Sequence, residues 1–356
     1  MMISVAAVLT FAAMGAENNS DAGLSPPFEQ ILKIDVHSHI FDDMPEFVEM
    51  LRRVNLRVVN ICVYGNKPEL LEPAEQRAEM IYQKYRPSFF FASTFDLTRR
   101  NEPGYAREVV AWLDKSFEAG AVMTKVWKEV GMELKTSTGA YLMADDPLFD
   151  PIYDHWAKRG KPLMAHLADP IEAWQALDAN NAHYDYFSRN PQWHVYGRAG
   201  FPAHAQIMAA RDNILAKHPD LAVIGAHLGS LEHDLEGLAQ RLDRFPNFNV
   251  DVSARTYVLQ RQPAEKVRRF FMKYQDRILY GTDSDAFTPG EEPSKEKRLA
   301  FTQKMEEAYR ADYAYYADKG KNHIGQNEIE CLSLPREALE KFYHKNAQRL
   351  MPALAE

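Results

Sequence analysis

Four histidines and one aspartate each follow a short apolar run of the sequence, a pattern that could build a metal site. They are His37 and His39 in IDVHSH, His166 in PLMAH, His227 in LAVIGAH and Asp283 in ILYGTD. Neutral imidazole is a common nitrogen ligand for zinc and related divalent ions. Any one of these histidines alone would fit an ordinary core role, but the group as a whole predicts a shared site.

Eight short apolar runs are the expected strands, and the candidate residues lie at or near their carboxyl ends. The runs are Lys33–Ile40, Arg57–Gly65, Phe89–Leu97, Ala121–Trp127, Pro162–Leu167, Leu221–Gly229, Phe248–Arg255 and Arg277–Asp283. Nearly continuous apolar runs are typical of strands buried on both faces, which are usually parallel. Segments with helical periodicity separate them; within 263–274, for example, apolar residues recur at i, i+3, i+4 and i+7.

Eight strands alternating with helices predict an α/β fold, a (β/α)₈ or TIM barrel formed by a single domain over residues 33–352. An open doubly wound sheet is the alternative, but Phe-Asp-Asp-Met-Pro follows Ile40 where that fold carries a glycine-rich turn. His37 and His39 are two residues apart and therefore share one face of their strand. Because the active face of a barrel lies at the carboxyl ends of its strands, we expect the candidate side chains to meet there.

Two connections are longer than a barrel needs. Residues 171–220 follow the fifth expected strand and begin with many aromatic residues, and residues 286–334 follow the eighth and include a charged, helix-like stretch. Loops at the carboxyl ends of barrel strands border the active face, so both segments are candidate lids or pocket walls. The alternative is that they cover the barrel or mediate self-association into a homo-oligomer.

The first residues differ in character from the rest of the chain. Residues 3–16 are uncharged and mostly apolar, a run shorter than the roughly 20 residues that span a membrane, so no stable membrane insertion is expected. The run fits the core of a secretory signal. We expect a signal peptide over residues 1–16, an N-terminal arm over 17–32, and export to the periplasm or outside the cell. No Lys or Arg precedes the run, so a loosely packed arm on a cytoplasmic protein is the alternative.

Charge and cysteine content exclude two further classes. The net charge is -8 and no cluster of Lys and Arg stands out, which gives no support for nucleic-acid binding. The two cysteines, Cys62 and Cys331, lack the CxxC spacing of a thiolate zinc site. The expected partner is therefore a small-molecule substrate.

The motifs resemble the amidohydrolase superfamily. HxH on the first strand, histidines on the fifth and sixth and an aspartate on the eighth match its metal-site pattern. The phrases IDVHSH, AHLGS and YGTD, with the closing phrase Asn346–Leu350 (NAQRL), resemble its amidohydrolase-related branch, amidohydrolase family 2. That branch also contains metal-dependent decarboxylases of aromatic acids.

The resemblance implies a ligand set and roles for its members. His37, His39, His166 and Asp283 would hold one divalent ion, with zinc the first expectation. A bound ion of this kind lowers the pKa of its water from about 16 towards 7, and Asp283 could accept the proton as general base. His227 would orient the water, polarise the substrate or serve a second ion.

Lys125 and Arg255 are the remaining candidate site residues. Superfamily members with two ions bridge them with a carboxylated lysine from the fourth strand, where Lys125 lies. An uncarboxylated Lys125 would instead be a fixed cation that attracts a substrate carboxylate, or would simply extend out of the barrel mouth. Arg255, at the end of the seventh expected strand, can chelate a carboxylate with two hydrogen bonds or pair with a nearby acid.

Three functions follow from these residues. The first is hydrolysis of an ester, lactone or amide carbonyl, with Asp283 and His227 as catalytic residues. The second is non-oxidative decarboxylation of an aromatic or unsaturated acid, a carboxy-lyase reaction in which Lys125 or Arg255 grips the acid. The third is a barrel that binds a metal or ligand without catalysis. Intact candidate positions argue against the third, because a decayed site would have lost at least one of them.

Overall fold

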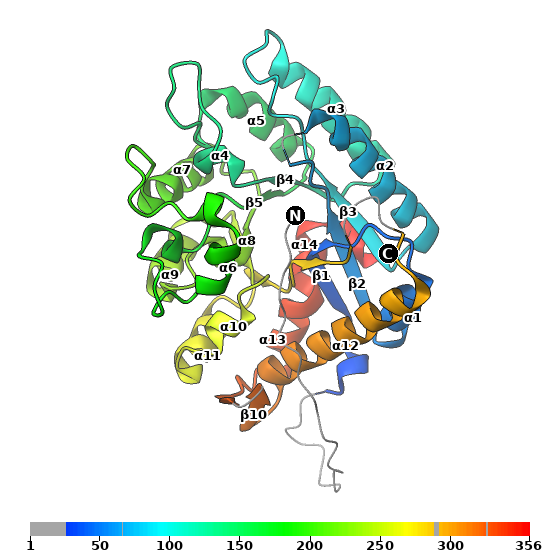
Figure 1. The fold of residues 1–356 in the computed structure, drawn as a ribbon. Helices are drawn as coiled ribbons and strands as arrows, with labels where there is room; N and C mark the ends of the chain where they lie inside the picture. Colours follow the sequence, from blue (N-terminus) through cyan, green and yellow to red (C-terminus); the bar gives the residue numbers. More distant parts are fainter. Residues whose placement is uncertain (1–25, 66, 288–291, 325–326) are drawn as a thin grey trace, which may run out of the picture.

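The computed structural model describes residues 26–65, 67–287, 292–324 and 327–356. Nine parallel strands form one curved sheet in the order β8-β7-β6-β5-β4-β3-β2-β1-β9 (Figure 1). The strands are β1 (Lys33–His39), β2 (Leu56–Ile61), β3 (Phe89–Ser93), β4 (Met123–Val126), β5 (Leu163–Ala165), β6 (Val223–Gly225), β7 (Phe248–Asp251), β8 (Ile278–Leu279) and β9 (Ser284–Asp285). The expected signal peptide over residues 1–16 and most of the expected arm lie outside the described residues.

The sheet closes on itself through β1. On one side β1 pairs with β2, and on the other side Ser38 and His39 pair with the residues of β9. The segment between β8 and β9 also reaches β1, because the Val36 N–H donates to the Tyr280 carbonyl at 3.0 Å. Closure confirms the predicted (β/α)₈ barrel, and the open doubly wound sheet is wrong.

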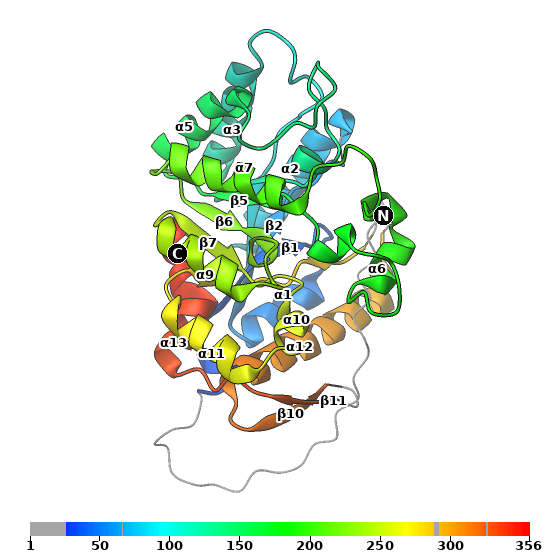
Figure 2. The same ribbon diagram turned by 90° about the vertical axis from the view of Figure 1, so that its left-hand side faces the viewer.

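Helices surround the barrel (Figures 1 and 2). The longer ones are α1 (Pro45–Arg53), α2 (Pro68–Tyr85), α3 (Tyr105–Ala119), α5 (Asp150–Lys158), α7 (His204–Lys217), α9 (Leu235–Arg244), α11 (Ala264–Lys273) and α12 (Lys295–Ala317). Shorter helices are α4 (Glu129–Met132), α6 (Tyr184–Arg189), α8 (Ala226–Gly229), α10 (Thr256–Leu259), α13 (Arg336–Glu340) and α14 (Asn346–Leu350). None of the helices in the described part of the chain is long and apolar enough to cross a membrane.

Apolar side chains fill the barrel interior below the site. Ile34, Val36, Val59, Met123 and Leu279 are among the buried residues of one cluster, together with the C-terminal segment around α14. A larger cluster lies between the strands and the surrounding helices. Polar side chains on the lumen side are therefore concentrated towards the carboxyl ends of the strands.

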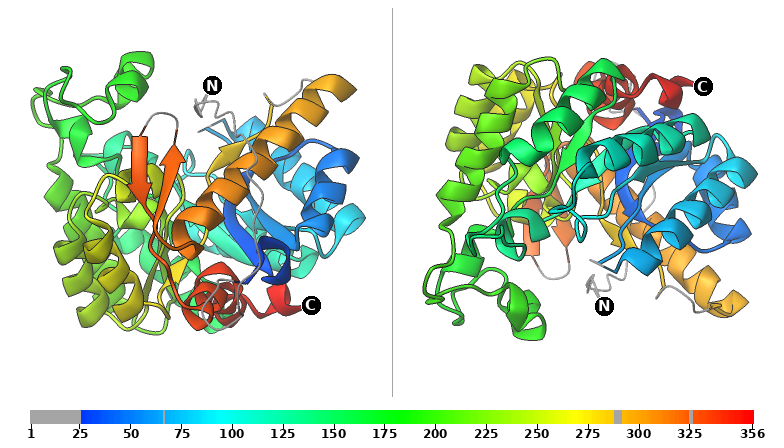
Figure 3. Two further views of the ribbon diagram at one scale, coloured as in Figure 1. Left: turned by 90° about the horizontal axis from the view of Figure 1, so that it is seen from below. Right: turned by 90° about the horizontal axis from the view of Figure 1, so that it is seen from above.

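Both long connections are present. The segment after β5 carries α6 and extends to one side of the barrel before α7 begins, and the segment after β9 holds α12 and a hairpin of β10 (Lys321–Ile324) and β11 (Asn327–Glu330) (Figure 3). Helix α12 lies along the barrel wall against α1, where the Phe47 and Phe301 rings are 5.6 Å apart. This contact of α12 fits the expectation that the segment covers the barrel.

The backbone is tightly packed where β6 passes β7. A Cβ atom added at Gly225 would lie 2.9 Å from the Gly229 Cα and 2.9 Å from the Phe248 Cε2. We expect Gly225→Ala to lower the free energy of unfolding by about 1–3 kcal/mol, because overpacking forces the backbone to shift. Denaturant unfolding measures the change, and a midpoint equal to that of the wild type would contradict it.

Candidate metal centre

Asp283 lies at the centre of a group of imidazoles at the barrel mouth. Its Oδ1 is 3.1 Å from His37 Nε2 and 3.2 Å from His39 Nε2, and its Oδ2 is 3.9 Å from His227 Nε2. One ligand atom each from His37, His227 and Asp283 lie within 4.8 Å of one another. Side chains from β1, from the turn after β6 and from the segment between β8 and β9 thus meet at one place.

His166 joins the same group. It directly follows β5, and its ring centroid is 4.4 Å from that of His227. Both of its ring nitrogens are buried without a hydrogen-bond partner among the described residues. Since an unsatisfied buried polar group costs about 1–3 kcal/mol, these nitrogens fit a role as ligand to an ion better than a purely structural one.

The other three imidazoles are held by their Nδ1 atoms. The Nδ1–H of His39 donates to the Ile61 carbonyl at 2.9 Å, that of His227 to the Ser253 carbonyl at 2.8 Å, and that of His37 to Asp251 Oδ2 at 3.0 Å. Each Nε2 lone pair is then left to face Asp283. Such fixing through the second ring nitrogen is typical of metal-ligating histidines.

Charge in the cluster favours a cation. Burial would raise the pKa of Asp283, but His37 and His227 outweigh it and hold that pKa well below its usual range. Burial and Lys125 lower the pKa of His37, yet Asp283 and Asp251 outweigh them and raise it. Burial lowers the pKa of His227 to about 3 and that of His166 to well below its usual range. His166 and His227 are therefore neutral beside an ionised Asp283, and such nitrogen and carboxylate donors suit a divalent ion.

The backbone is unusual where ligand-bearing segments leave the sheet. β1 contains a bulge: Asp35 and Ser38 are three positions apart in the chain, whereas their partners Val58 and Asn60 on β2 are two positions apart. Bulges next to active sites re-aim side chains. Here His37 faces the lumen like Val36, its immediate neighbour.

The strand ends predicted for the sixth and eighth runs are wrong. β6 stops at Gly225, and His227 lies in a short turn with a left-handed backbone, φ 58°. Pairing in the eighth run stops at Leu279 and resumes at Ser284, and Asp283 between them has φ 61°. Left-handed backbone at residues other than glycine is strained and persists where surrounding contacts enforce it, often at functional sites.

Asp251 and Ser253 of the seventh run support the cluster and were not predicted. Besides His37, the Asp251 carboxylate accepts the His227 N–H at 2.8 Å and the Ser253 hydroxyl at 2.5 Å. Burial would raise the pKa of Asp251, but His37 outweighs it and lowers that pKa to about 2. The sequence did carry a signal, since polar residues alternate with Val250 and Val252 at the end of this strand.

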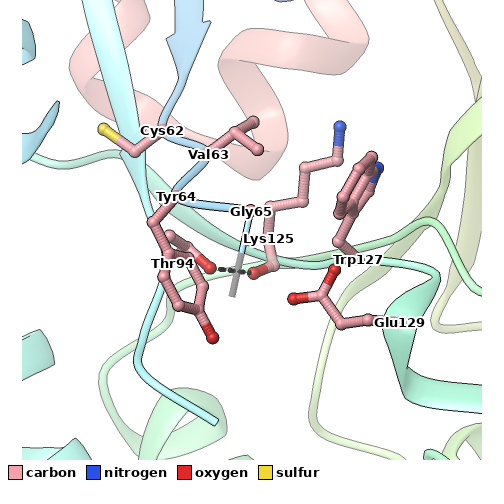
Figure 4. A pocket seen from close by; sticks show the side chains of 8 residues that line it. All are labelled: Cys62, Val63, Tyr64, Gly65, Thr94, Lys125, Trp127 and Glu129. Atoms are coloured by element: carbon pink, nitrogen blue, oxygen red, sulfur yellow. Dashed lines mark hydrogen bonds between the residues drawn. The ribbon is translucent and has the colours of Figure 1, made fainter. Parts of the chain in front are cut away.

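Lys125 points into the cluster. Its side chain is 2% exposed and its Nζ lies 2.7 Å from His37 Nε2, so the alternative of a lysine extending into solvent is wrong. Burial lowers the pKa of Lys125. Lys125, Trp127 and Glu129 line a small hollow beside the cluster, with residues that follow β2 and β3 (Figure 4).

Two further buried cations, Arg255 and Lys128, have acidic partners. Arg255 is 7% exposed and lies four residues beyond β7; its Nε donates to Glu232 at 2.7 Å and its Nη1 to the Ala254 carbonyl. The expected ion pair with a nearby acid is therefore present, although buried rather than on the surface. Lys128, which was not predicted, binds both oxygens of Asp169 at 2.6 and 2.8 Å.

The amidohydrolase family model matches residues 34–352. This chain belongs to the amidohydrolase 2 family of the amidohydrolase superfamily. The resemblance read from the sequence is thus confirmed. No curated protein sequence matches this amidohydrolase significantly.

Solved structures share the fold of this amidohydrolase. 2,6-Dihydroxybenzoate decarboxylase from Rhizobium is 14% identical, with a TM-score of 0.53 over 90% of this chain and 99% of the other. 5-Carboxyvanillate decarboxylase from Novosphingobium aromaticivorans, solved with manganese and 4-hydroxy-3-methoxy-5-nitrobenzoic acid, is 12% identical, with a TM-score of 0.52 over 93% of this chain and 98% of the other. At these identities the likeness concerns the fold.

The support that Asp251 gives to His37 and His227 can be tested through metal affinity. We expect Asp251→Asn to weaken divalent-ion binding about 10–100-fold, the usual cost of losing such an outer partner. Competition with a chromophoric chelator measures the affinity. Asn249→Ala on the same strand is the control, since Asn249 contacts Arg349 and backbone carbonyls. Equal affinities in the two variants would contradict the assigned role.

Proposed function

We propose that this amidohydrolase is a metal-dependent carboxy-lyase that decarboxylates a small aromatic or unsaturated acid. The observation that carries the proposal is the close approach of His37, His227 and Asp283, with the buried Lys125 beside them. Such a site offers a place for a divalent ion and a cation for a substrate carboxylate. The decarboxylase activities named for two structures of the same fold support this reaction over others.

The residues fit one divalent ion. His37, His39, His166 and Asp283 would hold it, with His227 as a further nitrogen beside them. The ion would supply Lewis-acid polarisation of a bound carboxylate or carbonyl oxygen. The manganese in the Novosphingobium enzyme makes Mn²⁺ a candidate beside the Zn²⁺ expected from the resemblance.

The chain's own residues account for binding and proton transfer. Lys125 would attract the substrate acid in a water-poor pocket, where a fixed charge is worth more than in solvent. The bond from the carboxyl carbon to its neighbour breaks, carbon dioxide leaves, and the electron pair remains on the neighbouring carbon. That carbon then takes a proton. We assign its delivery to Asp283 and His227, which would first accept the proton from a water molecule, because Asp283 is ionised and His227 neutral at the start. Arg255 stays a candidate for a second anionic group of the substrate.

Hydrolysis of an ester, lactone or amide is the second candidate. It is favoured by the low pKa of Asp283, which keeps the carboxylate ionised and able to accept a proton from an attacking water. The two reactions differ in product. Carbon dioxide appears only in the first and a ring-opened or cleaved acid only in the second, so a screen with both substrate classes separates them.

The metal-dependent carboxy-lyase proposal predicts the outcome of such a screen. Protein stripped of metal and reloaded with Mn²⁺ or Zn²⁺ is incubated with hydroxylated benzoates and with lactones, and carbon dioxide is followed with a coupled assay. We expect release of carbon dioxide from at least one benzoate, and at least about a hundredfold loss in Asp283→Asn, because a ligand contributes more than its outer partners. His155→Ala is the control, since His155 pairs with Asp114 outside the cluster.

Three outcomes would contradict the proposal. Cleavage of lactones without release of carbon dioxide would favour hydrolysis. Two ions per chain, with the added mass of a carboxyl group on Lys125, would replace the single-ion site by a bridged one. An activity that Asp283→Asn leaves intact would argue for chemistry elsewhere.

A further inference from the structure

Asp35 lies behind the metal centre, on the outer side of the barrel wall. It is two residues before His37, so an unbroken strand would place both side chains on one face. The bulge in β1 breaks that alternation, and Asp35 contacts α12 while His37 faces the lumen. Asp35 is 0% exposed.

The Asp35 carboxylate accepts four hydrogen bonds. Oδ1 accepts the backbone N–H groups of His37 at 3.1 Å and Thr282 at 3.0 Å. Oδ2 accepts the Thr282 hydroxyl at 2.6 Å and the Tyr309 hydroxyl at 3.1 Å. A buried carboxylate needs such donors, because they replace the water it has lost.

Two of these donors belong to the backbone that carries the proposed ligands. The His37 N–H lies in the bulge, so its bond to Asp35 stabilises the conformation that turns His37 inwards. Thr282 immediately precedes Asp283, whose left-handed backbone must be enforced by its surroundings. One carboxylate therefore fixes both segments at the point where each leaves the sheet.

The fourth donor comes from a distant part of the chain. Tyr309 lies on α12, 274 residues beyond Asp35, and is 1% exposed. Its hydroxyl connects the helix of the long segment after β9 to the carboxylate under the site. Helix α12 is held on the barrel by other contacts as well, including the Arg298–Glu46 ion pair at 3.1 Å. The helix thus presents Tyr309 to Asp35 from a fixed position.

We propose that Asp35 and Tyr309 are positioning residues of the metal centre, and that the segment after β9 serves the site by holding Asp35 rather than by closing over it. This inference rests on the proposed metal site. Without the Tyr309 hydroxyl, Asp35 Oδ2 keeps a single donor and the Thr282–Asp283 turn loses part of its support. Metal binding should then weaken although no proposed ligand has been changed.

The experiment compares two tyrosine variants of the same helix. Tyr309→Phe removes the hydrogen bond to Asp35, and Tyr313→Phe, the matched control, removes one from a buried tyrosine to the Pro26 carbonyl at 2.5 Å. Affinities for Co²⁺ and Mn²⁺ are measured on the full chain by competition with a chelator. The visible spectrum of bound Co²⁺ reports ligand geometry, and thermal unfolding of the metal-free protein reports stability.

We expect Tyr309→Phe to bind both ions about tenfold more weakly, at the lower end of the range for outer partners, and to alter the Co²⁺ spectrum. Tyr313→Phe should keep the wild-type affinity and spectrum. Asp35→Asn, if it folds, should weaken binding further. The shift in unfolding temperature should not distinguish the two tyrosine variants, which separates positioning from general stability.

If Tyr309→Phe keeps the wild-type metal affinity and Co²⁺ spectrum, the inference is overturned, whereas the proposed metal site is unaffected. The same loss in both tyrosine variants would also overturn it, because the effect would then be one of helix stability. Failure of the wild type to bind either ion would overturn the proposed function itself, and this inference with it. The three failures are therefore distinguishable.

Discussion

The structure depends on an ionised carboxylate that is surrounded by imidazoles inside a barrel. Asp283 faces Nε2 atoms of three histidines at 3.1 to 3.9 Å. Asp283 is partly buried, with 28% of its side chain exposed, and such an anion is costly unless positive charge balances it. The Asp283 oxygens and the histidine Nε2 lone pairs are all acceptors, so their short separations are unfavourable unless a cation lies among them. This constraint gives the metal-site account its physical basis.

Much of the surrounding structure can be understood as support for that arrangement. Asp251 holds the His37 ring and the His227 backbone from inside, and Asp35 holds the backbone of His37 and Thr282 from outside. Both carboxylates are buried, and both connect strands that are far apart in the sequence. The barrel thus brings the strands together, and the two aspartates fix how the side chains leave them.

The fold could be predicted because it depends on a repeated local pattern. Eight buried apolar runs separated by helical periodicity lead to one architecture, and each run overlaps with one of β1 to β8. The ends of the strands were less predictable. The apolar run continues past the end of β6 to Leu228. The backbone of His227 and Leu228 is nevertheless left-handed, and the hydrophobicity of a residue does not predict its φ angle. The β1 bulge could not be predicted for the same reason, because hydrophobicity does not indicate where a strand departs from regular pairing.

The candidate site was predictable only in part. The histidines and Asp283 stood out because they end apolar runs, and the structure brings them together. The partner of Arg255, the pairing of Lys128 with Asp169 and the contact of Tyr309 with Asp35 depend on the packing of distant loops and helices, which spacing along the chain does not encode. Asp251 is the exception, because it alternates with valines in the seventh run and this pattern indicates a side chain that faces the lumen.

The most direct measurement of the central claim is the anomalous diffraction signal of a crystal soaked in Mn²⁺. The account predicts one strong peak within coordinating distance of His37, His166 and Asp283, at the carboxyl end of the barrel. A peak elsewhere, or none at these residues while the protein is folded, would contradict it.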